Sequence, residues 1–154
     1  MTVSEMQQIR DDLRRDERLR LLPYDDATGL DIRPGNVLSG QLTIGYGHNL
    51  SERGITTQQA EDWLDQDIRF AIMDLFRTWP WIQQLDGPRQ VALTEMCFNL
   101  GVSRLKGFKK FLALMYARNY EQAAVEALDS HWADQVGARA TRIASIIHSG
   151  ELKG

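Results

Sequence analysis

Residues 15–29 read Arg-Asp-Glu-Arg-Leu-Arg-Leu-Leu-Pro-Tyr-Asp-Asp-Ala-Thr-Gly, and residues 41–48 read Gln-Leu-Thr-Ile-Gly-Tyr-Gly-His. Glu17 stands just past a predicted helix, and eight residues separate it from Asp26. The apolar residues between the two acids are typical of an extended segment, and Gly29 is typical of a turn. The stretch therefore predicts two carboxylates held by a helix end and a short sheet.

Paired carboxylates of this kind suit the cleavage of a glycosidic bond. One carboxyl group protonates the leaving oxygen, while the other activates water or stabilises the developing positive charge. Glu17 comes four residues after Leu13 and would continue the apolar face of the first helix if that helix persisted. Burial there would favour the protonated form that a general acid needs. The alternative is a surface glutamate paired with a nearby arginine, and spacing alone does not separate the two.

The order of these residues resembles that of the T-even phage lysozymes, a glycoside hydrolase family of endolysins. The family pattern is a Glu after the first helix, an Asp close to a Tyr, and then Thr-Ile-Gly-x-Gly-His. These features fall here on Glu17, Asp26 and residues 43–48. The resemblance implies that Glu17 is the general acid, and that Asp26 and Thr43 position and activate the attacking water, with inversion of configuration.

Two features depart from the family pattern. Arg18 replaces the glycine that commonly follows the catalytic glutamate, and sixteen residues separate Asp26 from the Thr-Ile-Gly motif. The family usually has a much shorter connection there. We expect the insertion, residues 27–42, to form a longer hairpin or a loop over the cleft. A register change in a longer hairpin would bring Asp25 or Asp31 forward in place of Asp26.

Helical periodicity predicts two helices around the sheet segment. The first covers residues 4–16 and begins with a capping box formed by Ser4 and Gln7. The second covers residues 57–78 and begins with a similar box that starts at Thr56. At about 1.5 Å per residue the second helix extends roughly 33 Å, which is enough to join two lobes.

Residues 79–154 have the pattern of a compact helical bundle. Its helices are predicted over residues 88–100, 105–117, 120–134 and 138–149. The apolar residues expected in its core are Val91, Leu93, Met96, Phe98, Leu112, Met115, Ala124, Leu128, Ile143 and Ile146.

The family resemblance continues through this helical part. The matching residues are Phe98-Asn99-Leu100-Gly101, Gly107-Phe108, Ala123-Ala124, Trp132 and Gln135-x-x-x-Arg139-Ala-x-Arg142. The resemblance implies that Arg139 reaches the carboxyl group of Glu17 and that Asn99 lies near the same site. The alternatives are a helix-surface cation for Arg139 and a hydrogen-bonded core amide for Asn99.

Asp67 interrupts the apolar face of the helix predicted over residues 57–78. A buried carboxylate needs a partner, and His48 at the end of the sheet segment is the expected one. The resemblance likewise implies a structural pair of His48 and Asp67. The three histidines of the chain form no metal-ligand spacing, so we expect neither a metal nor a cofactor.

Composition narrows the classes of function. The formal net charge of −3 argues against a nucleic-acid binder, which would carry a basic patch. Residues 77–154 are the more basic half, which reflects either solvated faces or attraction to an anionic wall polymer. The single Cys97 permits no intrachain disulfide. The N-terminal residues have neither the basic start nor the apolar core of a signal peptide, and no run is long enough to span a membrane.

Together these features predict an α+β, lysozyme-like fold in a single catalytic domain, residues 1–154. The sheet lobe would cover about residues 17–56, the linking helix about 57–78, and the helical lobe about 79–154 together with the N-terminal helix. The resemblance implies an endolysin that hydrolyses the β-1,4 bond between N-acetylmuramic acid and N-acetylglucosamine in peptidoglycan and lyses the host cell. A lytic transglycosylase that forms 1,6-anhydro ends and a non-catalytic peptidoglycan-binding module remain open alternatives.

We expect a monomer whose partner is the glycan strand of peptidoglycan, and neither nucleic acid nor a membrane. Without an export signal, the protein would accumulate in the cytoplasm of the infected bacterial host. It would then act on the cell wall in the periplasm once a separate holin had released it.

Overall fold

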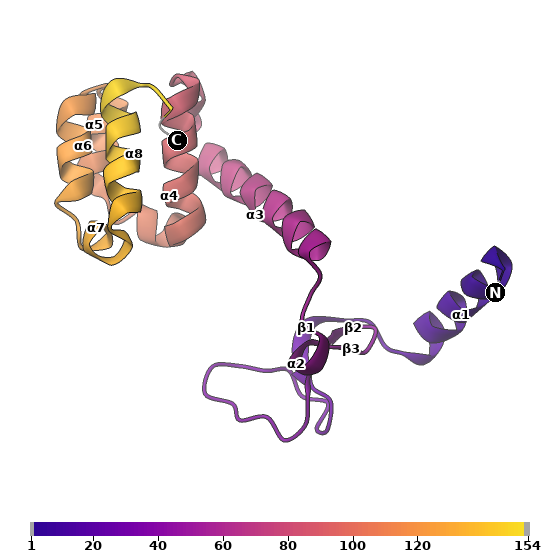
Figure 1. Ribbon diagram of the computed structural model, residues 1–154. Coiled ribbons are helices and arrows are strands. Elements are labelled where there is room, and N and C mark those ends of the chain that lie inside the picture. The colour runs from indigo at the N-terminus through magenta and orange to yellow at the C-terminus, as the bar shows by residue number, and fades with distance from the viewer. Residues whose placement is uncertain (1, 153–154) are drawn as a thin grey trace. The chain divides into compact units, whose positions relative to one another are not determined.

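A computed structural model describes residues 2–152 of the chain. The chain divides into two compact units, residues 1–60 and residues 61–154, whose elements are labelled in Figure 1. The first unit holds a small antiparallel sheet, and the second is helical. This content of helices and strands confirms the predicted α+β fold class.

Helix α1 (Val3–Asp16) has Thr2 as its N-cap, whereas Ser4 was predicted to begin the helix. The Thr2 hydroxyl accepts a hydrogen bond from the Glu5 N–H at 3.2 Å, and the Glu5 carboxylate accepts one from the Thr2 N–H at 2.6 Å. The predicted box of Ser4 and Gln7 is therefore wrong, because Thr2 and Glu5 make the same reciprocal pair two residues earlier. The large apolar residues of α1 are all exposed: Val3, Met6, Ile9 and Leu13.

The sheet contains the strands β1 (Arg20–Asp25), β2 (Leu42–Gly45) and β3 (His48–Asn49), in that order and antiparallel. Thr43 in the central strand lies opposite Tyr24 on one side and Asn49 on the other. Pro23 is tolerated because β1 is an edge strand, where a missing N–H leaves no ladder partner unsatisfied. The short helix α2 (Leu50–Arg53) follows at once, with Asn49 as its N-cap.

The insertion is an irregular loop rather than a longer hairpin. No residue from 27 to 41 belongs to a strand of the sheet, although Asp31 forms an isolated bridge with Tyr24. A turn follows, in which the Asn36 side chain accepts a hydrogen bond from the Arg33 N–H at 2.8 Å. Turn residues of this kind interrupt any alternating pattern, so the loop returns to the sheet without forming strands of its own.

Helix α3 (Thr57–Thr78) has the predicted bounds and the predicted capping box, because Gln59 donates its N–H to the Thr56 hydroxyl and accepts the Thr56 N–H. Residues 57–70 of this helix are exposed, whereas Ala71 and Leu75 are buried. The elements that follow are η1 (Pro80–Gln84), α4 (Gly87–Leu105), α5 (Lys109–Tyr116), α6 (Tyr120–Leu128), α7 (His131–Val136) and α8 (Ala138–Ser149).

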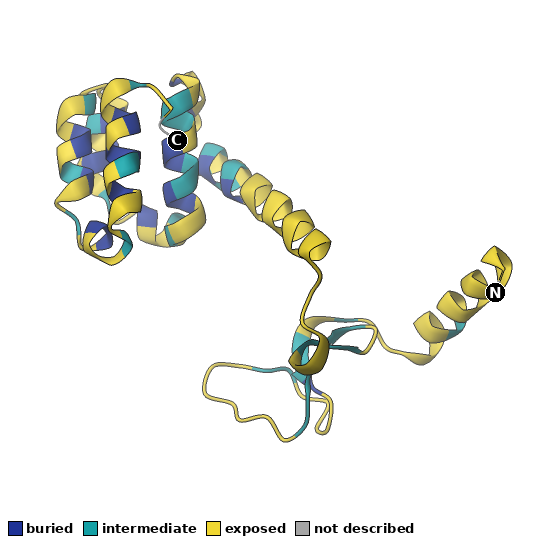
Figure 2. Cartoon of the chain, in the orientation of Figure 1, coloured by how far each residue is buried: buried dark blue, intermediate teal, exposed yellow. Residues whose placement is uncertain are grey.

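The second unit has one contiguous hydrophobic core. Helices α4, α5, α6 and α8 lie side by side, and their buried residues face inward (Figure 2). Leu93, Met96, Phe111 and Ile143 have no exposed surface. Burying a large apolar side chain contributes roughly 1.5–3 kcal/mol, so apolar burial stabilises this unit.

Three residues predicted for the core are exposed instead: Val91, Phe98 and Leu128. The helix predicted over residues 120–134 is in fact two helices, α6 and α7, because Ser130 separates them. Its hydroxyl donates to the Ala127 carbonyl at 2.6 Å and accepts the Ala133 N–H at 3.2 Å. One side chain thus ends the first helix and caps the second.

Helix α4 continues past Leu100, where its end was predicted, to Leu105. Gly101 nevertheless has non-helical φ and ψ of 71° and 155°, so the predicted end marks a real kink. A left-handed φ of this kind is available to glycine without a steric penalty. Among residues 2–152, no helix combines the length and the apolar character that crossing a bilayer requires.

Candidate active site

Glu17 is the C-cap of α1, three residues before β1 begins at Arg20. Its N–H donates to the Leu13 carbonyl at 2.7 Å, but its φ and ψ of −95° and 114° are extended. The helix therefore stops at Asp16, so the condition under which Glu17 would continue the apolar face is not met. The side chain is exposed. Of the nearby arginines, Arg14 forms an ion pair with Asp11 and Arg20 forms one with Asp31.

The carboxyl group of Glu17 points to the turn between β2 and β3. A Cβ placed on Gly47 would lie 3.6 Å from Glu17 Oε2, and Gly47 has a φ of +79°. The positive φ favours glycine at this position, whereas a Cβ there would be in ordinary van der Waals contact with the Glu17 carboxylate. The Gly-x-Gly stretch brings a bare backbone close to the predicted acid.

Asp26 lies at the start of the insertion and is exposed. Its Oδ1 accepts a hydrogen bond from the Gln41 N–H at 2.6 Å, while its own N–H donates to the Gln41 carbonyl at 3.1 Å. Within residues 2–152, no hydrogen bond engages its second oxygen, Oδ2. The carboxylate is therefore oriented by one backbone amide and retains one oxygen for another ligand.

Thr43 is linked to the same residue as Asp26. Its hydroxyl donates to the Gln41 carbonyl at 3.3 Å, and the side chain is only 4 % exposed. The structure thus brings two of the predicted site residues, Asp26 and Thr43, onto the backbone of Gln41. Nothing in the sequence pattern singled out Gln41, because its contribution comes from main-chain atoms.

The two acids that competed with Asp26 have other partners. Asp25 is 2 % exposed and accepts hydrogen bonds from the N–H groups of Ala27, Ser39 and Gly40. The hydrogen bond from Ser39, more than any other interaction, lowers the pKa of the Asp25 carboxyl below its ordinary value, although burial acts in the opposite direction. Asp31 forms an ion pair with Arg20 at 2.5 Å.

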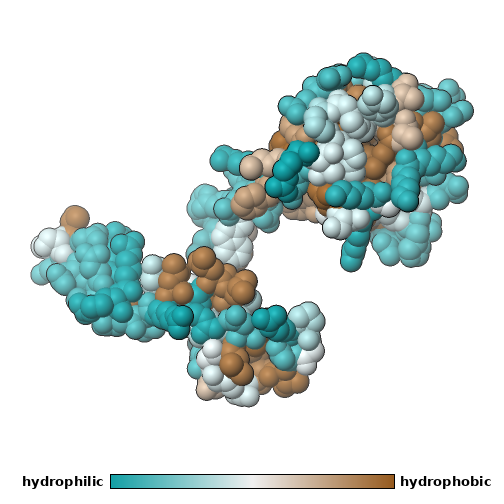
Figure 3. All heavy atoms as spheres, turned by 180° about the vertical axis from the view of Figure 1, so that it is seen from behind, coloured by the Kyte–Doolittle hydropathy of each residue, from teal (hydrophilic) through white to brown (hydrophobic). Residues whose placement is uncertain are grey.

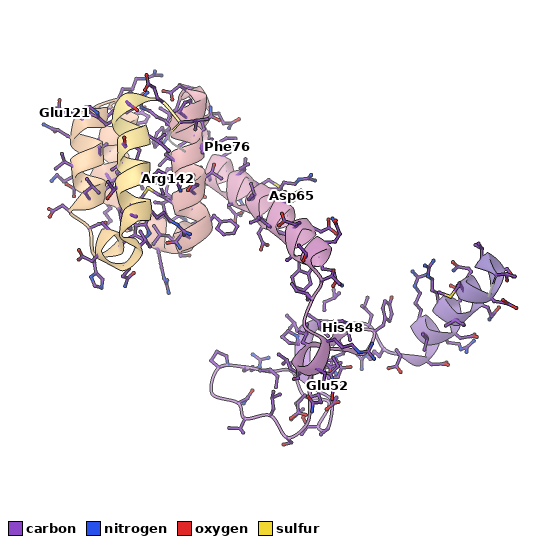
Figure 4. The ribbon with its side chains drawn as sticks, viewed as in Figure 1. His48, Glu52, Asp65, Phe76, Glu121 and Arg142 are labelled. Carbon is purple, nitrogen blue, oxygen red and sulfur yellow. The ribbon has the colours of Figure 1, made fainter. Side chains whose placement is uncertain are left out.

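His48 is held within the sheet unit. Its Nε2 lies 2.7 Å from the Gly54 carbonyl oxygen, and because a carbonyl can only accept, Nε2 carries the proton. Figure 4 labels His48 beside α2, which carries Glu52. Asp67 belongs to the other unit and is exposed on α3, so the pairing of His48 with Asp67 stays a prediction.

In the helical unit, the side chain of Asn99 is hydrogen-bonded to that of Trp132. Its Oδ1 accepts a hydrogen bond from the Trp132 indole N–H at 2.8 Å. Trp132 is 4 % exposed, and this bond satisfies its polar nitrogen. The Asn99 amide is therefore hydrogen-bonded, as in the structural alternative, but the residue is exposed and does not belong to the core.

A groove of about 660 Å³ runs along the helical unit between α3, α4 and α8. Its apolar wall accounts for the exposure of Val91 and Phe98, and Arg139 and Arg142 line it as well. Figure 3 shows hydrophobic residues at the surface among hydrophilic ones. The other apolar residues that line the groove are Leu64, Ile68, Ile72 and Phe76.

An ion pair in this groove was not predicted. Arg142, labelled in Figure 4, donates two hydrogen bonds to the Glu95 carboxylate, at 3.0 and 2.6 Å. The interaction with Glu95 raises the pKa of Arg142 above its ordinary value. The hydrogen bonds to the carboxylate are the larger cause, and its negative charge is the next. Glu95 lies next to Met96 in an apolar stretch of the sequence. An acid at such a position indicates that it has a partner, and this was the feature from which the ion pair could have been predicted.

A sequence model of the family described as Phage lysozyme matches residues 17–145. The match covers most of the chain and includes all seven predicted site residues. The chain belongs to the phage lysozyme family. Membership makes it a lysozyme-type glycosidase with peptidoglycan as its substrate, and it identifies the α+β fold as lysozyme-like.

The chain is also similar to individual proteins, two of which are named T4-type lysozymes. The chain is 27 % identical to Probable T4-type lysozyme 2 of Dictyostelium discoideum, over 86 % of this chain and 94 % of that protein. It is also 27 % identical to Probable T4-type lysozyme 1 of the same organism, over 94 % and 95 %. It is 30 % identical to the Pre-baseplate central spike protein Gp5 of Enterobacteria phage T4, over 92 % of this chain but 28 % of that longer protein.

Proposed function

We propose that this lysozyme is an endolysin that hydrolyses the β-1,4 bond between N-acetylmuramic acid and N-acetylglucosamine and so lyses the host cell. The observation that carries the proposal is the contrast between two exposed carboxylates of the sheet unit. Glu17 approaches the bare backbone at Gly47, whereas Asp26 is oriented by the Gln41 N–H. Two carboxyl groups in different surroundings suit the separate roles of acid and base.

In the proposed mechanism, Glu17 protonates the glycosidic oxygen of the leaving sugar. Asp26, with one oxygen fixed by Gln41, uses the other to accept a proton from the attacking water. Thr43 helps to position that water. Attack from the face opposite the leaving group inverts the anomeric carbon, and we expect the two carboxyl groups to lie roughly 6.5–9.5 Å apart, as in inverting enzymes.

The supporting residues follow the same proposal. Arg139 interacts with the Glu17 carboxyl, Asn99 lies near the site, and His48 pairs with Asp67 to hold the sheet segment. The proposed catalytic domain has a sheet lobe at about residues 17–56, a linking helix at about 57–78, and a helical lobe that includes α1. The exposed apolar face of α1 supports this last assignment, because such a face is available for burial.

The biological setting is part of the proposal. The protein acts as a monomer on peptidoglycan strands, stays in the cytoplasm of the infected bacterium until lysis, and reaches the periplasm through the action of a separate holin. The chemistry uses side chains of this chain alone. No metal or cofactor takes part.

Mass spectrometry of digested peptidoglycan tests the bond and the reaction type together. Digestion in water enriched in oxygen-18 should give N-acetylmuramic acid with a labelled reducing end, because water attacks the anomeric carbon. Products with 1,6-anhydro ends and no label would identify a lytic transglycosylase. An undigested wall, with the protein bound to it, would identify a binding module.

A further inference from the structure

Asp25 has an unusual position in the sheet unit. Among residues 2–60, the buried side chains are those of Asp25 and Thr43. A buried carboxylate is costly unless hydrogen bonds compensate for its lost hydration. Its environment should therefore explain why an acid stands at this position.

The Asp25 carboxylate accepts hydrogen bonds from both ends of the insertion. Oδ1 accepts from the Ala27 N–H and the Gly40 N–H, each at 3.0 Å, and Oδ2 accepts from the Ser39 N–H at 2.6 Å. Ala27 opens the loop, while Ser39 and Gly40 close it. A single carboxylate therefore fastens the two ends of the loop to each other.

This closure determines what lies against Asp26. Gly40 is so close that a Cβ there would stand 2.2 Å from Asp26 Oδ1 and 2.7 Å from the Ala27 Cβ. The next residue, Gln41, donates the N–H that orients the Asp26 carboxylate. The position of Asp26 thus depends on residues that Asp25 holds in place.

Asp25 is poorly suited to react with substrate itself. Both of its oxygens already accept backbone N–H groups, and the side chain is 2 % exposed. A general base must instead reach water or substrate within hydrogen-bonding distance. Its contacts are all internal, so any contribution to catalysis passes through a neighbour.

We propose that Asp25 is a positioning residue, which closes the insertion and thereby sets the orientation of the Asp26 carboxylate. The inference rests on the proposed role of Asp26 as the base. The insertion would then be part of the active site. Asp25 would hold the backbone at residues 39 and 40, and the neighbouring Gln41 N–H would align Asp26.

The first test is a double-mutant cycle with Asp25→Asn and Asp26→Asn. An amide nitrogen in place of one carboxylate oxygen cannot accept a hydrogen bond, so at least one N–H loses its partner while the side chain keeps its size. A misplaced catalytic group can cost roughly 10²-fold in rate, so we expect Asp25→Asn to lower kcat by about 10- to 100-fold with little change in KM. The matched control is Glu52→Gln, an exposed acid in the same unit, which should retain the parent rate.

The cycle separates the possible outcomes. If Asp25 acts through Asp26, Asp25→Asn should change the residual rate of the Asp26→Asn variant by less than about twofold. An equal fold-loss in both backgrounds, or a single Asp25→Asn variant with the parent rate, would overturn the inference. Full activity of Asp26→Asn would instead overturn the proposed role of Asp26.

Hydrogen exchange followed by NMR supplies a second test that does not depend on residual activity. In Asp25→Asn the amides of Ser39 and Gly40 should exchange faster, because Asp25 bonds them directly. The Gln41 amide should also lose protection, because its bond to Asp26 depends on the closed loop. Loss of protection confined to Ser39 and Gly40 would show that Asp25 does not position Asp26.

Discussion

In the helical unit every buried side chain of residues 61–152 is apolar, whereas the two buried side chains of residues 2–60, Asp25 and Thr43, are polar. The helical unit gains stability by removing apolar surface from water. The sheet unit has too few residues in regular structure to build such a core. Its closed loop relies instead on hydrogen bonds between a carboxylate and backbone amides. The two acids that we propose to be catalytic, Glu17 and Asp26, lie in this unit, whose buried side chains are polar.

The largest effect that this comparison predicts is on the stability of the helical unit. Leu93→Ala removes a side chain with no exposed surface and should cost about 2–5 kcal/mol of unfolding free energy. Leu128→Ala is the matched control, since Leu128 is 45 % exposed, and it should cost less than half as much. Urea unfolding measures both, and equal losses would contradict the assignment of the core.

The next effect concerns Gly40 in the sheet unit. Gly40→Ala places a Cβ against Asp26 and Ala27, so backbone and carboxylate must shift, at a cost of roughly 1–3 kcal/mol. Because Asp26 moves, lysis of cell walls should also slow. Gly87→Ala serves as the control, since a Cβ there meets nothing within 4 Å. Indistinguishable behaviour of the two variants in turbidity and unfolding assays would refute the close packing around Asp26.

A smaller effect is expected from the ion pair in the helical groove. The side chains of Glu95 and Arg142 are each about one-third exposed, so water and salt screen their attraction. Glu95→Gln should lower stability by about 0.2–1 kcal/mol, and the difference should shrink in high salt. A loss of roughly 3 kcal/mol or more, insensitive to salt, would mean that the pair is desolvated.

The smallest effect is a local response to acid. The pKa of Asp25 lies below its ordinary value of 3.8 in the folded protein, so its contribution is complete above 3.8 and is lost as the pH falls through the lower folded value. Exchange of the Ser39 and Gly40 amides, corrected for intrinsic rates, should quicken in that range. Asp25→Asn should not show this dependence on pH. The same dependence on pH of these two amides in the parent protein and in Asp25→Asn would argue that the carboxylate does not close the loop.

The helical unit could largely be predicted from its sequence. The 3.6-residue period gave the bounds of α3 and α8, because amphipathic helices repeat their burial at that interval. The same period did not predict the break between α6 and α7 at Ser130. Leu128 and Trp132 are four residues apart, as in a continuous helix, although the Ser130 hydroxyl ends one helix and caps the next. The period also assigned Val91 and Phe98 to the core, because apolar spacing does not distinguish a core from the wall of a groove.

The candidate site could be predicted from the sequence only at positions where side chains make up the family motif. Glu17, Asp26 and Thr43 follow from a spacing of residue types that the family shares. The roles of Gln41 and Asp25 could not be predicted, because backbone amides of an irregular loop leave no pattern in a sequence. Adjacent acids at positions 25 and 26 were read as competitors. Their environments differ because the two ends of the loop meet at Asp25, which is buried, whereas Asp26 is exposed.

The most direct test of the account is the rate of Glu17→Gln on bacterial cell walls. The amide has nearly the same shape as the acid but cannot deliver a proton, and general acid catalysis contributes typically about 10²–10⁴-fold. We predict a loss of that size in turbidity clearing, an unchanged unfolding midpoint, and a parent-like rate for the control Glu52→Gln. Near-normal clearing by folded Glu17→Gln would remove Glu17 from the mechanism.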